Sequence, residues 1–260
     1  QDVQVMPVSA ASLDEALAMT YAVFQAAADL TFREYGMRTL TADEGGLAPA
    51  FGRTEAMIAA AVRSIEAAGL RPGADVVLTL DVAGSHFTRD GLYHLEGERL
   101  DRAGMVARLL EWLDRYPIVS LEDGLAEEDW DGWAALCERA GARIMVMGDD
   151  LLCTNPARID RAIAGGAANA LLLKVNQVGT LTEAAAACQR ARAADWRVVI
   201  SARSGETEDN WLADLAVGWG GDHIKIGSIT QSERLAKYNR LLAIERETGL
   251  PLARWPGAAR

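Results

Sequence analysis

The stretch ALLLKVNQVGTLTEAAAACQRARAADWRVVIS, residues 170–201, contains two short apolar runs separated by a helical pattern. The runs ALLLKV (170–175) and RVVIS (197–201) are too short for helices, and LTEAAAACQRARAA (181–194) between them follows an amphipathic helical pattern. Continuous apolar strands joined by helices are typical of a parallel sheet whose two faces are covered. The stretch therefore predicts one strand–helix–strand unit of an α/β fold.

The same alternation extends through most of the chain. Each expected strand is followed by a helical pattern, and the strands are predicted at 76–82, 118–123, 143–150, 170–175, 197–201 and 223–228. The first third differs, because its one strand (3–8) is followed by two helices. The first helix is long, begins with a capping box at Ser12 and ends near Gly36, and the second is predicted at 54–69. The predicted order is strand, helix, helix and six strand–helix units. A closed parallel barrel needs eight strands, so seven predict either an open sheet or a further strand upstream of Gln1.

Length, composition and charge limit the classes of protein and partner. The 260 residues fit one large domain. Lys and Arg number 26 against 37 Asp and Glu, a net charge of -11 without a basic run, so we expect no direct binding of nucleic acid. The three cysteines lack metal-finger spacing and are expected to be reduced thiols. No signal peptide or long apolar stretch is present, which predicts a cytoplasmic protein without membrane insertion.

Three acidic residues stand at the ends of three consecutive predicted strands: Asp81, Glu122 and Asp149. Side chains at the carboxyl ends of successive barrel strands converge on one mouth, where barrel enzymes carry out their chemistry. Carboxylate oxygens of this kind suit Mg²⁺. The alternative is that each acid merely lies in a solvated loop, but three in register opposite lysines favour a metal site.

Basic residues end other strands. Lys174 follows an apolar strand and is a candidate base, with a counter-ion to the carboxylates as the alternative. Lys225, in HIKIGS, has the same two interpretations, and we favour anion binding. Arg203 and Ser204 offer a guanidinium fork, a hydroxyl and backbone N–H groups to a phosphate or carboxylate, although an ion pair of Arg203 with a nearby glutamate is equally compatible.

The loop ADEGGLAP carries the last candidate, Glu44, beside two glycines that permit a tight turn. A carboxylate there is a candidate general acid. By itself, this loop is a weak indication of function.

Taken together, these motifs resemble the enolase family, the glycolytic dehydratases of 2-phosphoglycerate. The matching stretches, in enolase order, are MPVSAASLDEAL, ADEGGLAP, LTLDVAGSHF, SLEDGLAEEDWDGW, MGDDLLCTNPARI, ANALLLKVNQVGTLTE, SARSGETEDNWLADLAVG, IKIGS and SERLAKYNRLLAIE. The resemblance implies a TIM-type barrel of order ββαα(βα)₆, with residues 1–260 forming the C-terminal barrel domain. It also implies that the first barrel strand and the N-terminal α+β domain of the family are missing from this chain.

The resemblance further implies a role for each matching residue. Asp81, Glu122 and Asp149 match the ligands of a Mg²⁺ ion. Lys174 matches the base that removes the proton from C2, and Glu44 matches an acid that helps the C3 hydroxyl to leave. The substrate-binding matches are Arg203 and Ser204 for the phosphate, Lys225 beside the carboxylate, and Gln1. A phosphorylated carboxylate substrate and a homodimer or higher homo-oligomer are implied as well.

The sequence departs from the family pattern around the departing hydroxyl. Ala202 stands where the family has a histidine, and Asp2 stands where it has a glutamate. Loss of an imidazole removes a titratable hydrogen-bonding group. Two alternatives therefore remain open beside a glycolytic enolase: an enolase-like lyase acting on a related phospho- or phosphono-carboxylic acid, and a catalytically silent binding homologue.

Overall fold

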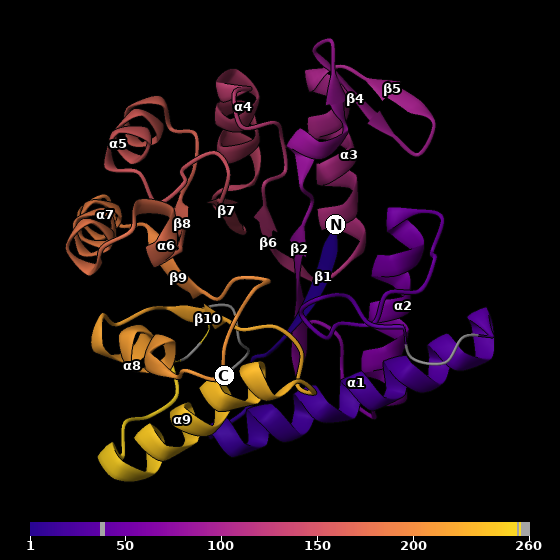
Figure 1. Cartoon of the computed structure of the whole chain (residues 1–260). Coiled ribbons are helices and arrows are strands. Elements are labelled where there is room, and N and C mark those ends of the chain that lie inside the picture. The colour runs from indigo at the N-terminus through magenta and orange to yellow at the C-terminus, as the bar shows by residue number, and fades with distance from the viewer. Residues whose placement is uncertain (37–39, 254, 256–260) are drawn as a thin grey trace. The chain divides into compact units, whose positions relative to one another are not determined.

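The computed structural model describes residues 1–36, 40–253 and 255, and its main sheet has seven strands in the order β1, β2, β6, β7, β8, β9, β10 (Figure 1). These strands are β1 (Asp2–Pro7), β2 (Val76–Asp81), β6 (Ile118–Glu122), β7 (Met145–Gly148), β8 (Ala170–Leu173), β9 (Arg197–Ser201) and β10 (His223–Lys225). All seven predicted strands are present, and each is hydrogen-bonded to the next one along the chain. The α/β fold with a sheet of barrel order is therefore confirmed.

The helices alternate with these strands as the sequence predicts. They are α1 (Leu13–Tyr35), α2 (Thr54–Ala67), α3 (Arg102–Arg115), α4 (Trp130–Ala140), α5 (Pro156–Gly165), α6 (Val175–Val178), α7 (Leu181–Ala193), α8 (Trp211–Gly218) and α9 (Ser232–Thr248), with a 3₁₀ turn η1 (Gly84–Phe87). Ser12 caps α1 by accepting from the N–H of Glu15 at 3.2 Å, and Gly36 ends it at φ 62°. Within the described ranges, no helix is both long and apolar enough to cross a membrane.

A small antiparallel sheet between β2 and α3 is absent from the prediction. It consists of β3 (Thr88–Arg89), β4 (Leu92–Leu95) and β5 (Glu98–Leu100). The first turn contains Asp90 and Gly91, both at positive φ, and an Asp-Gly pair is a strong hairpin signal. The strands themselves are too short to show a clear alternation of polar and apolar residues.

The chain divides into two compact units, and the first contains residues 1–4 and 78–199. Strands β2, β6, β7 and β8 run parallel to their neighbours here. Helices α3, α4 and α7 pack against strands of this sheet, and α5 packs against α4 and α7 (Figure 1). Leu121, Val146 and Leu171 are fully buried in the sheet. Within the described residues, the three cysteines of this unit form no disulfide. Because neighbouring strands are parallel, their carboxyl ends lie side by side.

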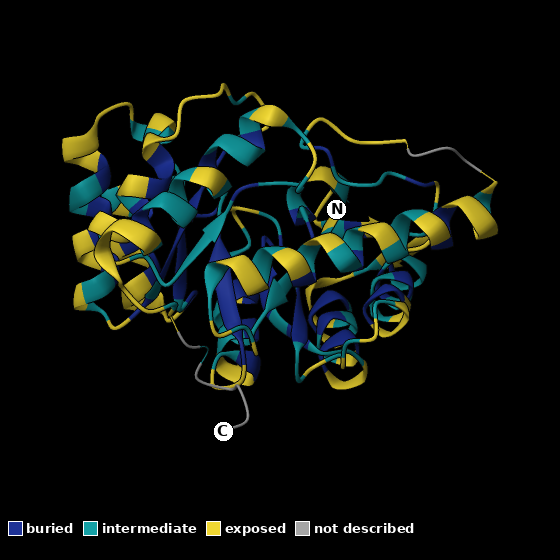
Figure 2. Ribbon diagram, turned by 90° about the horizontal axis from the view of Figure 1, so that it is seen from below, coloured by how far each residue is buried: buried dark blue, intermediate teal, exposed yellow. Residues whose placement is uncertain are grey.

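The second unit contains residues 5–77 and 200–260, of which residues 37–39, 254 and 256–260 lie outside the described ranges. Helix α1 packs against α2 and α9, and α9 also packs against α8. Strands β1 and β10 are mostly half-buried, whereas the outward faces of the helices are exposed (Figure 2). Two charged side chains of α9, Arg234 and Lys237, are nevertheless completely buried.

Candidate functional site

Four of the predicted site residues lie at the carboxyl ends of neighbouring strands in the first unit. Asp81 and Glu122 are the last residues of β2 and β6 and are register partners. Asp149 follows β7 directly, and Lys174 follows β8 directly. The parallel sheet therefore delivers three carboxylates and one ammonium group to the same edge, as the sequence predicts for a barrel mouth.

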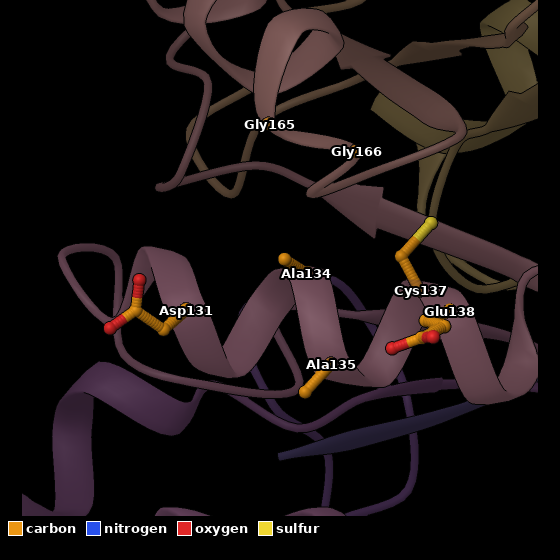
Figure 3. Close-up of a pocket in the computed structure, with 7 residues that line it drawn as sticks. All are labelled: Asp131, Ala134, Ala135, Cys137, Glu138, Gly165 and Gly166. Atoms are coloured by element: carbon orange, nitrogen blue, oxygen red, sulfur yellow. The ribbon is translucent and has the colours of Figure 1, made fainter.

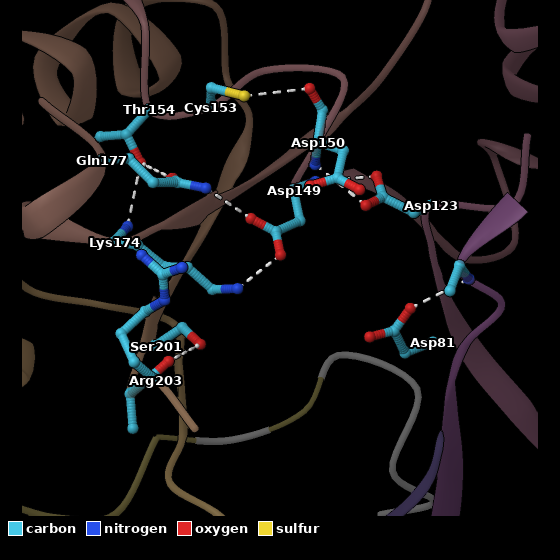
Figure 4. Close-up of polar contacts among 12 residues, drawn as sticks. Asp81, Asp123, Asp149, Asp150, Cys153, Thr154, Lys174, Gln177, Ser201 and Arg203 are labelled. Atoms are coloured by element: carbon cyan, nitrogen blue, oxygen red, sulfur yellow. Dashed lines mark hydrogen bonds and ion pairs between the residues drawn. The ribbon is translucent and has the colours of Figure 1, made fainter. Parts of the chain in front are cut away.

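Lys174 and Asp149 form an ion pair whose side chains are only 12% and 13% exposed. The other oxygen of Asp149, Oδ1, accepts from Nε2 of Gln177 at 2.8 Å (Figure 4). The hydroxyl of Thr154 donates to Oε1 of Gln177 at 2.6 Å and accepts from the backbone N–H of Lys174 at 2.9 Å. These contacts close a ring of hydrogen bonds that fixes both the lysine and the aspartate.

Asp123 holds the turn that carries Asp149. Its two carboxylate oxygens accept from the backbone N–H groups of Asp149 and Asp150 at 3.0 and 2.9 Å. Burial of the carboxyl group, together with the charge of Asp149, raises the pKa of Asp123 to about 7, although the two backbone hydrogen bonds act in the opposite direction. Burial and the charge of Asp149 also raise the pKa of Asp150.

Asp123, Asp149 and Asp150 can together hold a metal ion, because one carboxylate oxygen from each lies within 4.8 Å of the others. The set predicted from the sequence shares only Asp149 with this group. Of its other two members, Asp81 accepts from the backbone N–H of Ala83 at 3.1 Å, and Glu122 is 1% exposed. Both sets consist of hard oxygen ligands, the type that Mg²⁺ prefers.

The predicted anion-binding residues lie in the second unit. Arg203 and Ser204 follow β9, and Lys225 ends β10. The backbone N–H of Ala202 donates to the carbonyl of Lys225 at 2.9 Å, which ties the two strand ends together. Two nearby glutamates, Glu206 and Glu208, are considered from the sequence as ion-pair partners of Arg203, and Glu206 accepts from the backbone N–H of Arg203 at 2.9 Å.

Glu44 lies in a turn of the second unit. Its backbone carbonyl accepts from the N–H of Ser228 at 2.9 Å, so the turn is fixed beside the segment that follows β10. The next residue, Gly45, has φ 81°, and a Cβ there would lie 3.0 Å from the side chains of Ser228 and Gln231. The glycine is therefore required by both the turn and the packing.

Gln1 is exposed at the start of the first unit, immediately before β1. Its position is adjacent to Asp2, the residue that replaces a glutamate of the family pattern.

The sequence interpretation assigns no role to four residues that support the strand-end cluster: Asp123, Asp150, Thr154 and Gln177. Two of them are immediate neighbours of predicted ligands, in the pairs Glu-Asp and Asp-Asp. A shallow depression on the outer side of α4, by contrast, contains none of the predicted residues (Figure 3). Its lining is Asp131, Ala134, Ala135, Cys137, Glu138, Gly165 and Gly166.

The sequence profile of one known family covers almost the whole chain. The family is described as Enolase, C-terminal TIM barrel domain, and its profile matches residues 1–258. This match agrees with the element order, the parallel strand pairs and the acidic cluster described above. The chain therefore belongs to the enolase C-terminal TIM barrel domain family.

Proposed function

We propose that the protein is a Mg²⁺-dependent lyase that dehydrates 2-phosphoglycerate to phosphoenolpyruvate. The observation that carries this proposal is the partly buried ion pair of Lys174 and Asp149 at adjacent strand ends, beside the register partners Asp81 and Glu122. A base and a set of cation ligands at one edge are the groups needed to remove a proton next to a carboxylate.

The proposed ligands are all carboxylates, the donor type that Mg²⁺ prefers. Asp81, Glu122 and Asp149 would hold it, with Asp123 fixing the turn of Asp149 through two backbone hydrogen bonds. When bound, Mg²⁺ supplies positive charge that stabilises negative charge on a substrate carboxylate. Protein ligands of metal ions are usually oriented by further hydrogen bonds, and Gln177 provides one to Asp149 at 2.8 Å.

The remaining residues divide the proton transfers and the binding of substrate. Lys174 takes the proton from C2, and Glu44 gives a proton to the C3 hydroxyl, which leaves as water while the C2–C3 double bond forms. The residues proposed to bind substrate are Arg203 and Ser204 for the phosphate, Lys225 for the carboxylate, and Gln1. By family resemblance we further propose a cytoplasmic, glycolytic homodimer.

A second candidate is an enolase-like lyase for a related phospho- or phosphono-carboxylic acid. Ala202 favours it, because this residue is 6% exposed and its methyl group can neither donate nor accept a proton. The polar contacts of Ala202 involve only its backbone, with its N–H bonded to Lys225 and its carbonyl accepting from Ser201.

The decisive experiment is a turnover assay with 2-phosphoglycerate and Mg²⁺, performed on the product of the whole gene. The parent is compared with Lys174→Ala, Ala202→His and a surface control, Asp114→Asn, whose side chain is 65% exposed. The primary proposal expects phosphoenolpyruvate from the parent and the control and essentially none from Lys174→Ala. Product from Ala202→His alone would favour the second candidate, and no turnover of any phospho- or phosphono-carboxylate would favour a silent homologue.

A further inference from the structure

Helix α9 contains two buried cations that the proposed chemistry does not use. Arg234 and Lys237 are both 0% exposed. Burial of a charged group costs several kcal/mol unless hydrogen bonds or opposite charges compensate for it. The contacts of these two side chains therefore indicate what their burial achieves.

The Arg234 guanidinium binds three backbone carbonyls, and its Nε lies 3.6 Å from the partly buried carboxylate of Glu233. Its Nη1 donates to the carbonyls of Arg203 at 2.7 Å and Ile226 at 3.1 Å, and its Nη2 donates to the carbonyl of Ser204 at 2.7 Å. The planar fork of arginine suits this bridging of two segments, which a lysine cannot reproduce. Arg234 thereby fixes the orientation of two consecutive peptide groups in the loop after β9.

That orientation also determines where the amide groups of the loop point. The chain has no cis peptide bonds in its described part, and in a trans peptide the C=O and N–H groups point in opposite directions. Because the carbonyls of Arg203 and Ser204 point at Arg234, the N–H groups of Ser204 and Gly205 point away from it. Both of these residues are exposed. Successive N–H groups directed to one side form an anion-binding concavity.

Lys237 fixes the other end of the same loop. Its Nζ donates to the carbonyl of Thr207 at 2.5 Å and pairs with Glu206 at 2.9 Å. The second oxygen of Glu206 accepts from the N–H of Arg203 at 2.9 Å. The loop 203–207 is therefore held at both ends by one face of α9.

The same face holds the segment after β10. Tyr238 donates its hydroxyl hydrogen to the carbonyl of Gly227 at 2.7 Å. Gly227 has φ 115°, and a Cβ there would lie 2.9 Å from Cδ of Arg234 and 3.1 Å from the carbonyl of Glu44. Arg234 thus fits against this glycine, and any side chain at position 227 would displace it.

We propose that Arg234 and Lys237 are positioning residues that shape the loop 203–207 into an anion site, with the N–H groups of Ser204 and Gly205 as donors. The identification of that anion as the phosphate group of a substrate rests on the proposed function. The two α9 cations act through the loop and do not touch the anion.

Titration with inorganic phosphate, followed by the amide NMR signals of Ser204 and Gly205, tests the proposal without turnover. The variants are Arg234→Lys, which keeps the charge but loses the fork, and Arg246→Lys, a matched control at an exposed position of the same helix. We expect the Kd for phosphate to rise on the order of tenfold in Arg234→Lys, because fixed hydrogen-bond geometry is lost, and to change less than about twofold in the control. In steady-state assays, the KM should rise by a similar factor while kcat changes less.

A folded Arg234→Lys variant with the parent Kd would overturn the proposal, and so would a parent protein that does not bind phosphate at this loop. If Arg234→Lys does not fold, Gly227→Ala replaces it, because the added methyl group displaces Arg234 without removing its charge. Unchanged phosphate affinity in Gly227→Ala would again refute the positioning role. A parent that binds phosphate here but forms no phosphoenolpyruvate refutes only the proposed function.

Discussion

Replacement of Thr154 by valine should weaken both the fold and the candidate site. Thr154 is completely buried, and its hydroxyl makes two hydrogen bonds, to Oε1 of Gln177 at 2.6 Å and from the N–H of Lys174 at 2.9 Å. Valine has nearly the same shape, so the substitution removes the hydroxyl without leaving a cavity. The backbone of Thr154 has φ 51°, which is a strained conformation for threonine and valine alike. The strain therefore cancels when the two side chains are compared.

The magnitude follows from the two lost hydrogen bonds. Each contributes about 1 kcal/mol net, and a buried partner left without a bond adds about 1–3 kcal/mol. Gln177 and Lys174 are only partly buried, so water compensates in part, and we expect the free energy of unfolding to fall by about 2–4 kcal/mol in total. Loss of a residue that orients a metal ligand typically costs about 10–100-fold in metal affinity or activity, so kcat should also fall.

Urea unfolding at constant pH measures the first effect, and Thr154→Ser provides the matched control. Serine keeps the hydroxyl and loses one methyl group, which costs about 0.8 kcal/mol. The valine variant should therefore be clearly less stable than the serine variant. Equal stabilities of the two variants would refute the ring of hydrogen bonds as a stabilising element.

Two further predictions concern the metal and the effect of pH. Asp149→Asn should reduce the affinity for Mn²⁺, used as a paramagnetic probe, by about tenfold or more, because the charge of a proposed ligand is lost. The control Asp114→Asn, at an exposed position, should leave the affinity unchanged. Equal affinities of the two variants would exclude Asp149 as a ligand. Burial and the hydrogen bond to Asp129 raise the pKa of Tyr93. The protonated side chain therefore makes its full contribution to the free energy of unfolding below about pH 10, and this contribution is lost as the pH rises further. Between about pH 9 and 12, the free energy of unfolding should fall less steeply with pH in Tyr93→Phe than in the control Tyr21→Phe, whose side chain is exposed. Equal slopes in the two variants would contradict this prediction.

The sequence was sufficient for the strand order and for the ends of the strands. The apolar runs are long enough to identify, and each is separated from the next by a helix that forces a parallel connection. A charged residue directly after such a run must lie at the carboxyl end of the sheet, which is why Asp149 and Lys174 could be placed together. Adjacency of the two strands was enough to predict that these residues lie near each other, without information on any other contact.

Support from distant or turn residues could not be predicted in this way. Thr154 lies 20 residues from Lys174 in the chain, and its hydroxyl meets the lysine N–H only because the turn after β7 takes a left-handed conformation at Cys153 and Thr154. Neither residue is one for which sequence patterns predict positive φ. The choice between candidate metal ligands that differ by one position, such as Glu122 and Asp123, likewise depends on side-chain direction rather than on spacing.

The loop after β9 shows why a change in chemistry at Ala202 need not disturb the fold. Its backbone N–H bonds to Lys225, and the peptides that follow are fixed by Arg234 and Lys237 from another element. No polar side-chain atom at position 202 is needed for these contacts. The frame that presents Arg203 and Ser204 is therefore independent of the side chain between Ser201 and Arg203. Under the proposed function, a substitution there would alter proton transfer or substrate choice while the proposed anion site keeps its shape.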